Sequence, residues 1–188
     1  MNVTIFVGDI ADVSAEAICT STNPRLSLMM GTGAAVRARG GYEILRACEA
    51  IIAKSGRSAL PAGSVHVTAA GSLSCKRIIH CVASGVAHQS SEAIIEMCVR
   101  NALAAADAEG CRTIAMPVFA SGHARIKFDR ALSVMANAIR TASTGVERVT
   151  IVVHEAELAE TIRRVFPGAP IEIGDIVEED PVSPWSME

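Results

Sequence analysis

Short, strongly apolar runs alternate along the chain with longer segments in which apolar residues recur every three or four positions. The short runs are rich in Val, Ile and Thr and are bounded by Gly, Pro, Asp or Ser, which is typical of β-strands. Strands that alternate with helical segments indicate an α/β fold. The runs that predict strands are residues 2–6, 16–21, 64–69, 77–82, 112–118 and 148–154.

Four of the intervening segments carry apolar residues at helical spacing. Gly56 and Gly110 stand where two of these helices should end. Several strands carry apolar residues along most of their length, as expected when helices cover both faces of a sheet. The pattern therefore predicts a three-layer α/β/α sandwich around a mixed, largely parallel sheet. The helical segments are residues 43–54, Ile95 with Val99, Ala102 and Ala106, Phe128 with Leu132, Met135 and Ile139, and residues 156–166.

Beyond Pro167 the composition changes, with three further prolines and the acidic run Glu178-Glu179-Asp180. We expect one domain over residues 1–167 and a tail over 168–188, in which an edge strand at 171–173 is followed by disordered chain. Trp185 has two interpretations: it anchors the tail to the body or to a partner, or it belongs to a loosely attached terminus.

Composition narrows the class of ligand. A chain of 188 residues fits one hydrophobic core, and because half of it is apolar but only 3% aromatic, that core is mainly aliphatic. The net charge of −3 argues against non-specific binding to a polyanion, so nucleic acid is not an expected partner. An anionic ligand must then be held by a local site.

Cysteine spacing and hydropathy give expectations about metals and location. The cysteines show no CxxC or Cys/His ligand spacing, so we expect reduced core residues, no metal site and no cofactor. No window approaches the length of a membrane span, and the first residues do not resemble a signal peptide. We expect a cytoplasmic protein without a membrane partner. The six cysteines are Cys19, Cys48, Cys75, Cys81, Cys98 and Cys111.

Three loops that follow predicted strands are candidates for chemistry, because ligands gather there in α/β sheets. The first is residues 8–10, where Asp9 either caps the next segment or faces a ligand. The second is residues 30–36, where glycines opening a helix either cradle an anion or permit tight packing. The third is residues 119–123, whose main chain can present donors to a phosphate oxygen. Two such loops facing one another would clamp a diphosphate.

Order and spacing of these pieces resemble the macrodomain family. The segment 8–41 follows the family's order of Asp9, Asn23 and glycine loop. The match continues through residues 63–68, 78–82, 114–122 and 152–154 and covers roughly residues 1–166. The chain looks most like the macrodomains of histone variants, a comparison that favours binding over turnover.

The resemblance implies ADP-ribose, free or on a modified protein, as ligand. Asp9 would accept a hydrogen bond from the adenine amine, the Ile10 N–H would contact the ring, and Asn23 would face the distal ribose. Val153 and His154 would line the adenine side. The residues that would enclose the diphosphate are Gly31, Thr32, Gly33 and Ala34 on one side and Ala120, Ser121, Gly122 and His123 on the other. Ala124 or Arg125 stands where relatives often place an aromatic lid.

Whether the chain is an enzyme stays open at this level. Relatives that hydrolyse ADP-ribosyl esters or O-acetyl-ADP-ribose often carry an acid in the glycine loop, and here the matching residue is Gly33. Hydrolysis of such esters or of ADP-ribose 1''-phosphate by substrate-assisted attack of water, with Asn23 orienting the ribose, is the first alternative to binding. Binding of RNA or poly(A) is the second. The sequence does not predict the oligomeric state.

The histidines divide by context. His80 lies inside an apolar strand and is expected in the core, and His66 lies on an alternating strand and is expected to be exposed. His88 occupies a loop of small residues, where a catalytic role is the minor interpretation. His123 stands beside the proposed phosphates, but no partner carboxylate qualifies it as a general base.

Overall fold

The computed structural model describes residues 1–122 and 126–174, and in this part of the chain seven strands form one sheet. The strand order is β3-β4-β2-β5-β6-β1-β7, and only β3 runs antiparallel to its neighbour. The mixed, largely parallel sheet is therefore confirmed, and each predicted strand agrees with the observed one to within one residue at either end. The strands are β1 (Asn2–Val7), β2 (Ala17–Thr22), β3 (Val65–Ala69), β4 (Arg77–Val82), β5 (Thr113–Pro117), β6 (Arg148–Val153) and β7 (Ile171–Ile173).

Helices connect the parallel strands, as crossover connections require. Ser91 caps the longest helix, α3, by accepting a hydrogen bond from the Ile94 N–H. Gly56 ends α2 in the left-handed conformation at a φ of 63°, as the sequence predicts. The helices are α1 (Gly31–Gly40), α2 (Tyr42–Ser55), α3 (Glu92–Ala108), α4 (Phe128–Thr141) and α5 (Ala156–Val165), with a 3₁₀ turn, η1, at Ile10–Asp12.

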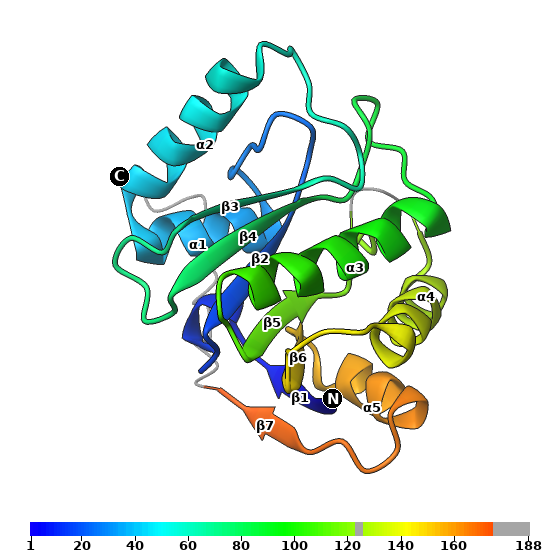
Figure 1. Cartoon of the computed structure of the whole chain (residues 1–188). Coiled ribbons are helices and arrows are strands. Elements are labelled where there is room, and N and C mark those ends of the chain that lie inside the picture. Colours follow the sequence, from blue (N-terminus) through cyan, green and yellow to red (C-terminus); the bar gives the residue numbers. More distant parts are fainter. Residues whose placement is uncertain (123–125, 175–188) are drawn as a thin grey trace, which may run out of the picture.

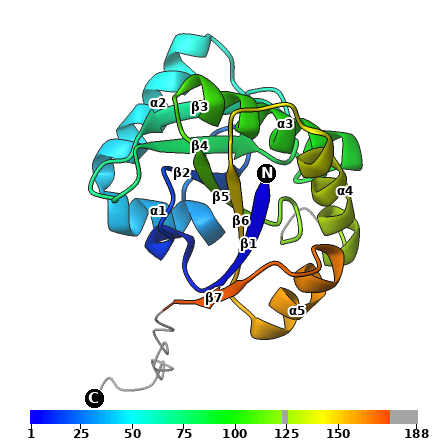
Figure 2. The same cartoon turned by 60° about the horizontal axis from the view of Figure 1, so that its bottom comes forward.

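Alternating residues of the strands enter two different cores, which is why apolar residues occur on both faces of the strands. In β4, Ile79 and Cys81 pack under α3, whereas Ile78 and Val82 pack under α1 and α2. Figure 2 shows α1 and α2 on one side of the sheet and α3, α4 and α5 on the other. The predicted three-layer α/β/α sandwich is thus confirmed.

The parallel strands all end at the same edge of the sheet, and this edge gathers the loops that follow β4, β2, β5, β6 and β1 (Figure 1). The residues on these loops lie up to about 145 positions apart in the sequence, from Asp9 to His154. Because ligands of open α/β sheets bind outside the carboxyl ends of the strands, this carboxyl edge is the place to look for a site.

The C-terminal edge strand is also found, since β7 pairs with β1 from Ile5 opposite Ile171 to Val7 opposite Ile173. The remainder of the predicted tail, with its acidic run and Trp185, lies outside the described residues. All six cysteines are buried and unpaired, as expected for reduced core residues. Among the helices that the structure describes, none has the length and apolar character needed to cross a bilayer.

Candidate functional site

A cavity of about 320 Å³ opens at the carboxyl edge between the loops that follow β2, β4, β5 and β6. Both candidate phosphate loops of the sequence border it, Gly31 and Thr32 from one side and Ala120, Ser121 and Gly122 from the other. Its remaining described lining residues are Ser21, Thr22, Asn23, Ser27, Met29, Met30, Ala83, Ser84, His88, Pro117, Val118 and His154.

Asn23 leaves β2 and organises the first wall of the cavity. Its Oδ1 accepts hydrogen bonds from the Arg25 N–H at 3.0 Å and the Ser27 N–H at 3.3 Å, the local turn that Asn favours. These two bonds orient the amide, so that its Nδ2 is the group left to contact a ligand. Leu26, inside this turn, is held at a φ of 51°, a conformation that non-glycine residues rarely adopt.

The N-terminus of α1 forms the second wall. Met30 precedes the helix without a side-chain cap, so the first N–H groups have no side-chain acceptor. Thr32 fixes this end to the sheet, because its Oγ1 accepts a hydrogen bond from the Ser21 N–H at 3.1 Å. The uncapped N–H groups and the positive end of the helix dipole therefore border the cavity at Gly31 and Thr32 and favour an anion there.

Gly31, Gly33 and Ala34, at the start of α1, have different structural roles. Gly31 has a φ of 55° and open space beside it, so it shapes the turn that faces the cavity. Gly33 is buried, and a Cβ there would lie 3.1 Å from the Leu28 Cα, so it permits close packing. The Ala34 N–H is already committed to the Met30 carbonyl at 3.4 Å. Of the four predicted residues, only Gly31 and Thr32 line the cavity.

The turn after β5 forms the third wall. Ala120 is 5% exposed and adopts a φ of 60°, and Ser121 Oγ donates to the Val118 carbonyl at 2.9 Å. Such a turn holds strained backbone because its surroundings fix it, a condition that clusters at binding sites. A Cβ on Gly122 would meet no heavy atom within 4 Å, so the space beside it is open. The predicted residues His123 and Ala124, with Arg125, lie outside the described residues.

The loop after β4 supplies a fourth wall that sequence reasoning missed. Ser84 and His88 both line the cavity, and His88, like Leu26 and Ala120, has a positive φ, at 58°. The loop is tied by a hydrogen bond from the Gly85 N–H to the Gln89 carbonyl at 2.8 Å. Their place in the site depends on strand order, because β4 is a parallel neighbour of β2 and its following loop reaches the same edge.

The proposed adenine end lies beside the cavity and is not part of its lining. Asp9 follows β1, one strand beyond His154, and its Oδ1 accepts a hydrogen bond from the Ala11 N–H at 2.9 Å. The cap predicted for Asp9 is therefore real, and its second carboxylate oxygen is left for other partners. Ile10 is 1% exposed, and the Val153 carbonyl accepts from the Gly8 N–H. Of the three predicted residues at this end besides Asp9, only His154 borders the cavity.

The described lining carries no Asp, Glu, Lys or Arg, so polar contacts come from the main chain, from hydroxyls, from Asn23 and from two histidines. This composition suits recognition of an anion by N–H groups without a competing carboxylate. Within residues 1–122 and 126–174, no three His, Cys, Asp or Glu side chains gather closely enough to hold a metal ion.

His80 and His66 lie away from this cavity. His80 is fully buried, and its ring nitrogens contact Thr20 Oγ1 and Thr68 Oγ1, both at 3.0 Å, as expected for a core residue. Burial, aided by repulsion from His66, lowers the pKa of His80 to about 4. The expectation that His66 is exposed was wrong: it is half-buried beside Ser64 Oγ, because helices pack over both faces of β3.

Comparison with known proteins agrees with this geometry. The family model described as Macro domain matches residues 19–135. A macro domain-containing protein of Streptomyces coelicolor is 31% identical over 159 residues, which cover 84% of this chain and 94% of the relative. An O-acetyl-ADP-ribose deacetylase of Salmonella typhimurium is 31% identical over 171 residues, covering 86% and 92%.

Solved structures agree in fold. A mutant of the Oceanobacillus iheyensis macrodomain with ADPR superposes at a TM-score of 0.78, with 24% identity, and the match covers 86% of this chain and 90% of that one. A Trypanosoma brucei macrodomain in complex with ADP-ribose gives a TM-score of 0.76 at 16% identity, covering 88% and 69%. With the sheet order, the paired glycine turns and these matches together, the chain belongs to the macro domain family.

Proposed function

We propose that this protein binds ADP-ribose, free or attached to a modified protein, in the cavity at the carboxyl edge. The observation that carries the proposal is that two turns, at Gly31–Thr32 and at Ala120–Gly122, border one cavity. The described lining of this cavity contains no Asp, Glu, Lys or Arg side chain. A diphosphate matches this arrangement, because uncapped N–H groups and a helix dipole favour an anion at a fixed place.

The ends of the ligand are assigned by what lies on either side of the diphosphate. Asp9 sits beyond His154 along the edge, where its free carboxylate oxygen can accept from the adenine amine, with the Ile10 N–H beside it. Asn23 lies on the other side, where its Nδ2 can donate to a hydroxyl of the distal ribose. The Oceanobacillus iheyensis macrodomain mutant with ADPR and the Trypanosoma brucei macrodomain in complex with ADP-ribose support this choice of ligand.

A second candidate function is hydrolysis of an ADP-ribosyl ester or of O-acetyl-ADP-ribose. The similarity to the Salmonella deacetylase favours it, and Asn23 in the cavity is the candidate catalytic residue. Against it stands Gly33, since the position where active relatives carry an acid is buried against Leu28. Attack by a water that the substrate's own phosphate activates would need no protein base.

Calorimetric titration with ADP-ribose, ADP, AMP and oligo(A) tests the binding proposal. We expect ADP-ribose to bind most tightly and AMP, which lacks the diphosphate, to bind much more weakly. Tighter binding of oligo(A) than of ADP-ribose would replace the proposal with RNA recognition. Release of acetate from O-acetyl-ADP-ribose, compared between the wild type and Asn23→Ala, then separates hydrolysis from binding.

The proposal also concerns the partner of the protein and the compartment in which it binds. An ADP-ribosylated protein is the macromolecular partner that the proposal includes, and we propose the cytoplasm as the place of binding. The six buried, unpaired cysteines support a reducing compartment.

A further inference from the structure

The loop between β4 and α3, residues 83–91, borders one end of the cavity proposed for ADP-ribose. The loops along the carboxyl edge follow β4, β2, β5, β6 and β1 in that order, because β3 runs antiparallel and ends at the opposite, amino edge of the sheet. Asp9 follows β1, at one extreme of this series, and the loop after β4 is at the other extreme. A ligand whose adenine lies at Asp9 therefore directs its opposite end toward residues 83–91.

Three hydrogen bonds fix the shape of this loop. The Gly85 N–H donates to the Gln89 carbonyl at 2.8 Å, and the His88 N–H donates back to the Gly85 carbonyl at 3.0 Å. Ser90 Oγ donates to the Ala83 carbonyl at 2.7 Å, which joins the end of the loop to its beginning. The turn holds His88 at a φ of 58°, a conformation that non-glycine residues rarely adopt and that clusters at binding sites.

Ser84, on the same loop, has a hydroxyl group that is available in the cavity. Only 8% of this residue is exposed, and it lines the cavity. Among residues 1–122 and 126–174, the Ser84 Oγ takes part in no hydrogen bond, and no side-chain polar atom that lacks a partner is fully enclosed. The hydroxyl therefore reaches the open space of the cavity, where a ligand can pair with it.

The chemistry of these two side chains matches the terminal ribose of ADP-ribose, because a ribose hydroxyl both donates and accepts a hydrogen bond. Asn23 Oδ1 already accepts from the Arg25 and Ser27 N–H groups, so Asn23 offers the ribose only its donor, Nδ2. The Ser84 hydroxyl and a neutral His88 ring can each donate and accept. They therefore supply the acceptors that the ribose hydroxyls still need.

We propose that His88, together with Ser84, binds the terminal ribose and determines the preference of this protein for ADP-ribose over ADP. This inference rests on the proposed binding of ADP-ribose and adds to it the residues that recognise the last sugar. ADP ends at the diphosphate, so it can occupy the two glycine turns without reaching residues 83–91. Removing a contact that only the terminal ribose makes should therefore weaken the binding of ADP-ribose and leave that of ADP unchanged.

Calorimetric titration of the full chain with ADP-ribose and with ADP tests this proposal. His88→Gly removes the ring, and glycine adopts the positive φ without strain. We expect its affinity for ADP-ribose to fall about tenfold, the effect of losing one hydrogen-bonding side chain, and its affinity for ADP to stay at the wild-type value. His88→Asn tolerates the same φ and keeps a donor and an acceptor, so it should retain more ADP-ribose affinity than His88→Gly. Ser84→Ala should also weaken ADP-ribose alone.

Matched variants separate contact with the ligand from damage to the loop. Val86→Ala changes a largely exposed side chain of the same loop that does not line the cavity, so it should bind both ligands as the wild type does. His154→Ala removes the other histidine of the described lining, at the adenine end. Because both ligands contain adenine, His154→Ala should weaken ADP-ribose and ADP by the same factor.

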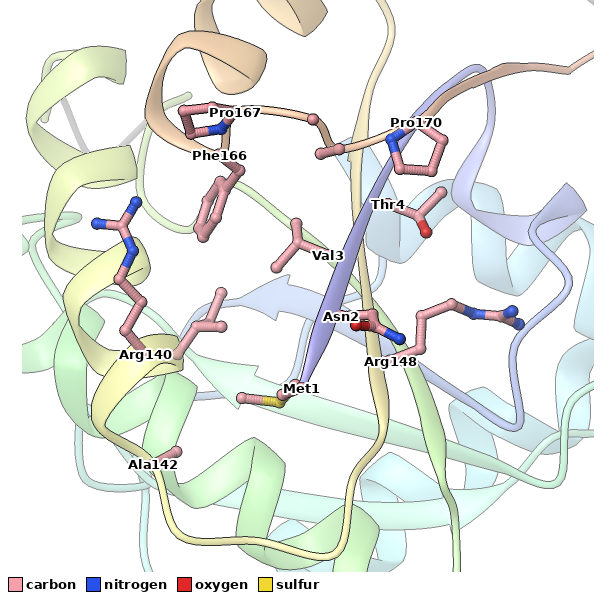
Figure 3. A pocket seen from close by; sticks show the side chains of 13 residues that line it. Met1, Asn2, Val3, Thr4, Arg140, Ala142, Arg148, Phe166, Pro167 and Pro170 are labelled. Carbon is pink, nitrogen blue, oxygen red and sulfur yellow. The ribbon is translucent and has the colours of Figure 1, made fainter.

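A larger hollow at the amino edge is the competing place for an anionic ligand. This hollow, of about 790 Å³, has Arg140 and Arg148 on either side of β1 (Figure 3). Arg148→Ala removes one of these charges and should leave the binding of both ligands unchanged. Weaker binding of both ligands by Arg148→Ala would place the nucleotide in this hollow and overturn the proposal.

The remaining outcomes distinguish this inference from the proposed function. Equal weakening of ADP-ribose and ADP by His88→Gly would overturn the inference, and so would wild-type affinity for ADP-ribose in both His88→Gly and Ser84→Ala. Either result would leave the binding of ADP-ribose itself intact. Absence of ADP-ribose binding by the wild type would instead overturn the proposed function.

Discussion

The two edges of the sheet differ in how they treat polar groups. At the amino edge, Lys76 pairs with Glu16, Arg77 with Glu109 and Arg112 with Glu147, so charges on neighbouring strands and turns satisfy one another. At the carboxyl edge, the described cavity lining has no ion pair, and the N-terminus of α1 is left without a side-chain cap.

Backbone strain follows the same division. Among residues 1–122 and 126–174, the three non-glycine residues with positive φ, Leu26, His88 and Ala120, all lie on loops at the carboxyl edge. Each such conformation costs on the order of 1 kcal/mol or more and persists only where the surrounding structure imposes it. Charged side chains at the amino edge therefore pair with one another, whereas the carboxyl edge keeps N–H groups available for a ligand.

The largest expected effect is at the carboxyl edge, from Gly122→Glu. The new carboxylate would occupy the open space beside the proposed diphosphate, and like charges brought together weaken binding by several kcal/mol, at least about a hundredfold in Kd. Calorimetry with ADP-ribose measures the loss, and thermal unfolding checks that the fold is retained. Gly122→Gln matches the size without the charge and should bind more tightly than Gly122→Glu. Equal binding by wild type and Gly122→Glu would remove this turn from the site.

A second large effect concerns the core, away from both edges. Burial lowers the pKa of His80 from 6.5 to about 4. Between these pH values His80 is therefore protonated in the unfolded chain and neutral in the folded protein. The free energy of unfolding should therefore fall as the pH is lowered from 6.5 to 4, by roughly 3 kcal/mol from this residue. Urea unfolding at several pH values measures the slope, and His80→Gln should have a shallower slope in this range. The same slope in both proteins would contradict the assignment.

Asp9→Asn tests whether Asp9 accepts a hydrogen bond from the adenine at the carboxyl edge. The amide oxygen can still accept from the Ala11 N–H, so η1 keeps its cap, but the second group becomes a donor facing the adenine amine. We expect ADP-ribose affinity to fall by about 1 to 3 kcal/mol, because a buried polar group of the ligand loses its acceptor. Asp9→Ala should weaken binding similarly and also reduce stability. Unchanged affinity in both variants would move adenine away from Asp9.

The smallest effect is expected at the amino edge. Arg112→Ala removes the ion pair with Glu147, and both side chains are largely exposed, so the free energy of unfolding should change by less than about 1 kcal/mol. ADP-ribose affinity should stay at the wild-type value, as measured by the same calorimetry. A marked loss of affinity would mean that a change at the amino edge alters ligand binding at the carboxyl edge, which would contradict the separate roles of the two edges.

The strands and helices follow closely from the sequence because each has a strong local signal. In the run of residues 77–82, neighbouring positions such as Ile78 and Ile79 are both apolar, and this indicates a strand covered on both faces. Gly56 likewise marks the end of α2 by its left-handed conformation. The spacing of apolar residues and the glycines that end helices are local features of the sequence, so they can be recognised without knowledge of the fold.

The site was predicted less completely because it depends on strand order. The turns at Gly31 and Ser121 were predicted from their glycines, but His88 and Ser84 carry no such signal and reach the cavity only because β4 lies beside β2. The distinct roles of Gly31 and Gly33 were also hidden, since only the position of Leu28 shows which glycine is needed for packing.

A crystal structure of the protein with ADP-ribose tests the central claim most directly. We expect the diphosphate oxygens to accept hydrogen bonds from N–H groups of both turns, at Gly31–Thr32 and at Ala120–Gly122, with Asp9 at the adenine and Asn23 at the distal ribose. A diphosphate bound to only one turn, or ADP-ribose bound outside this cavity, would contradict it.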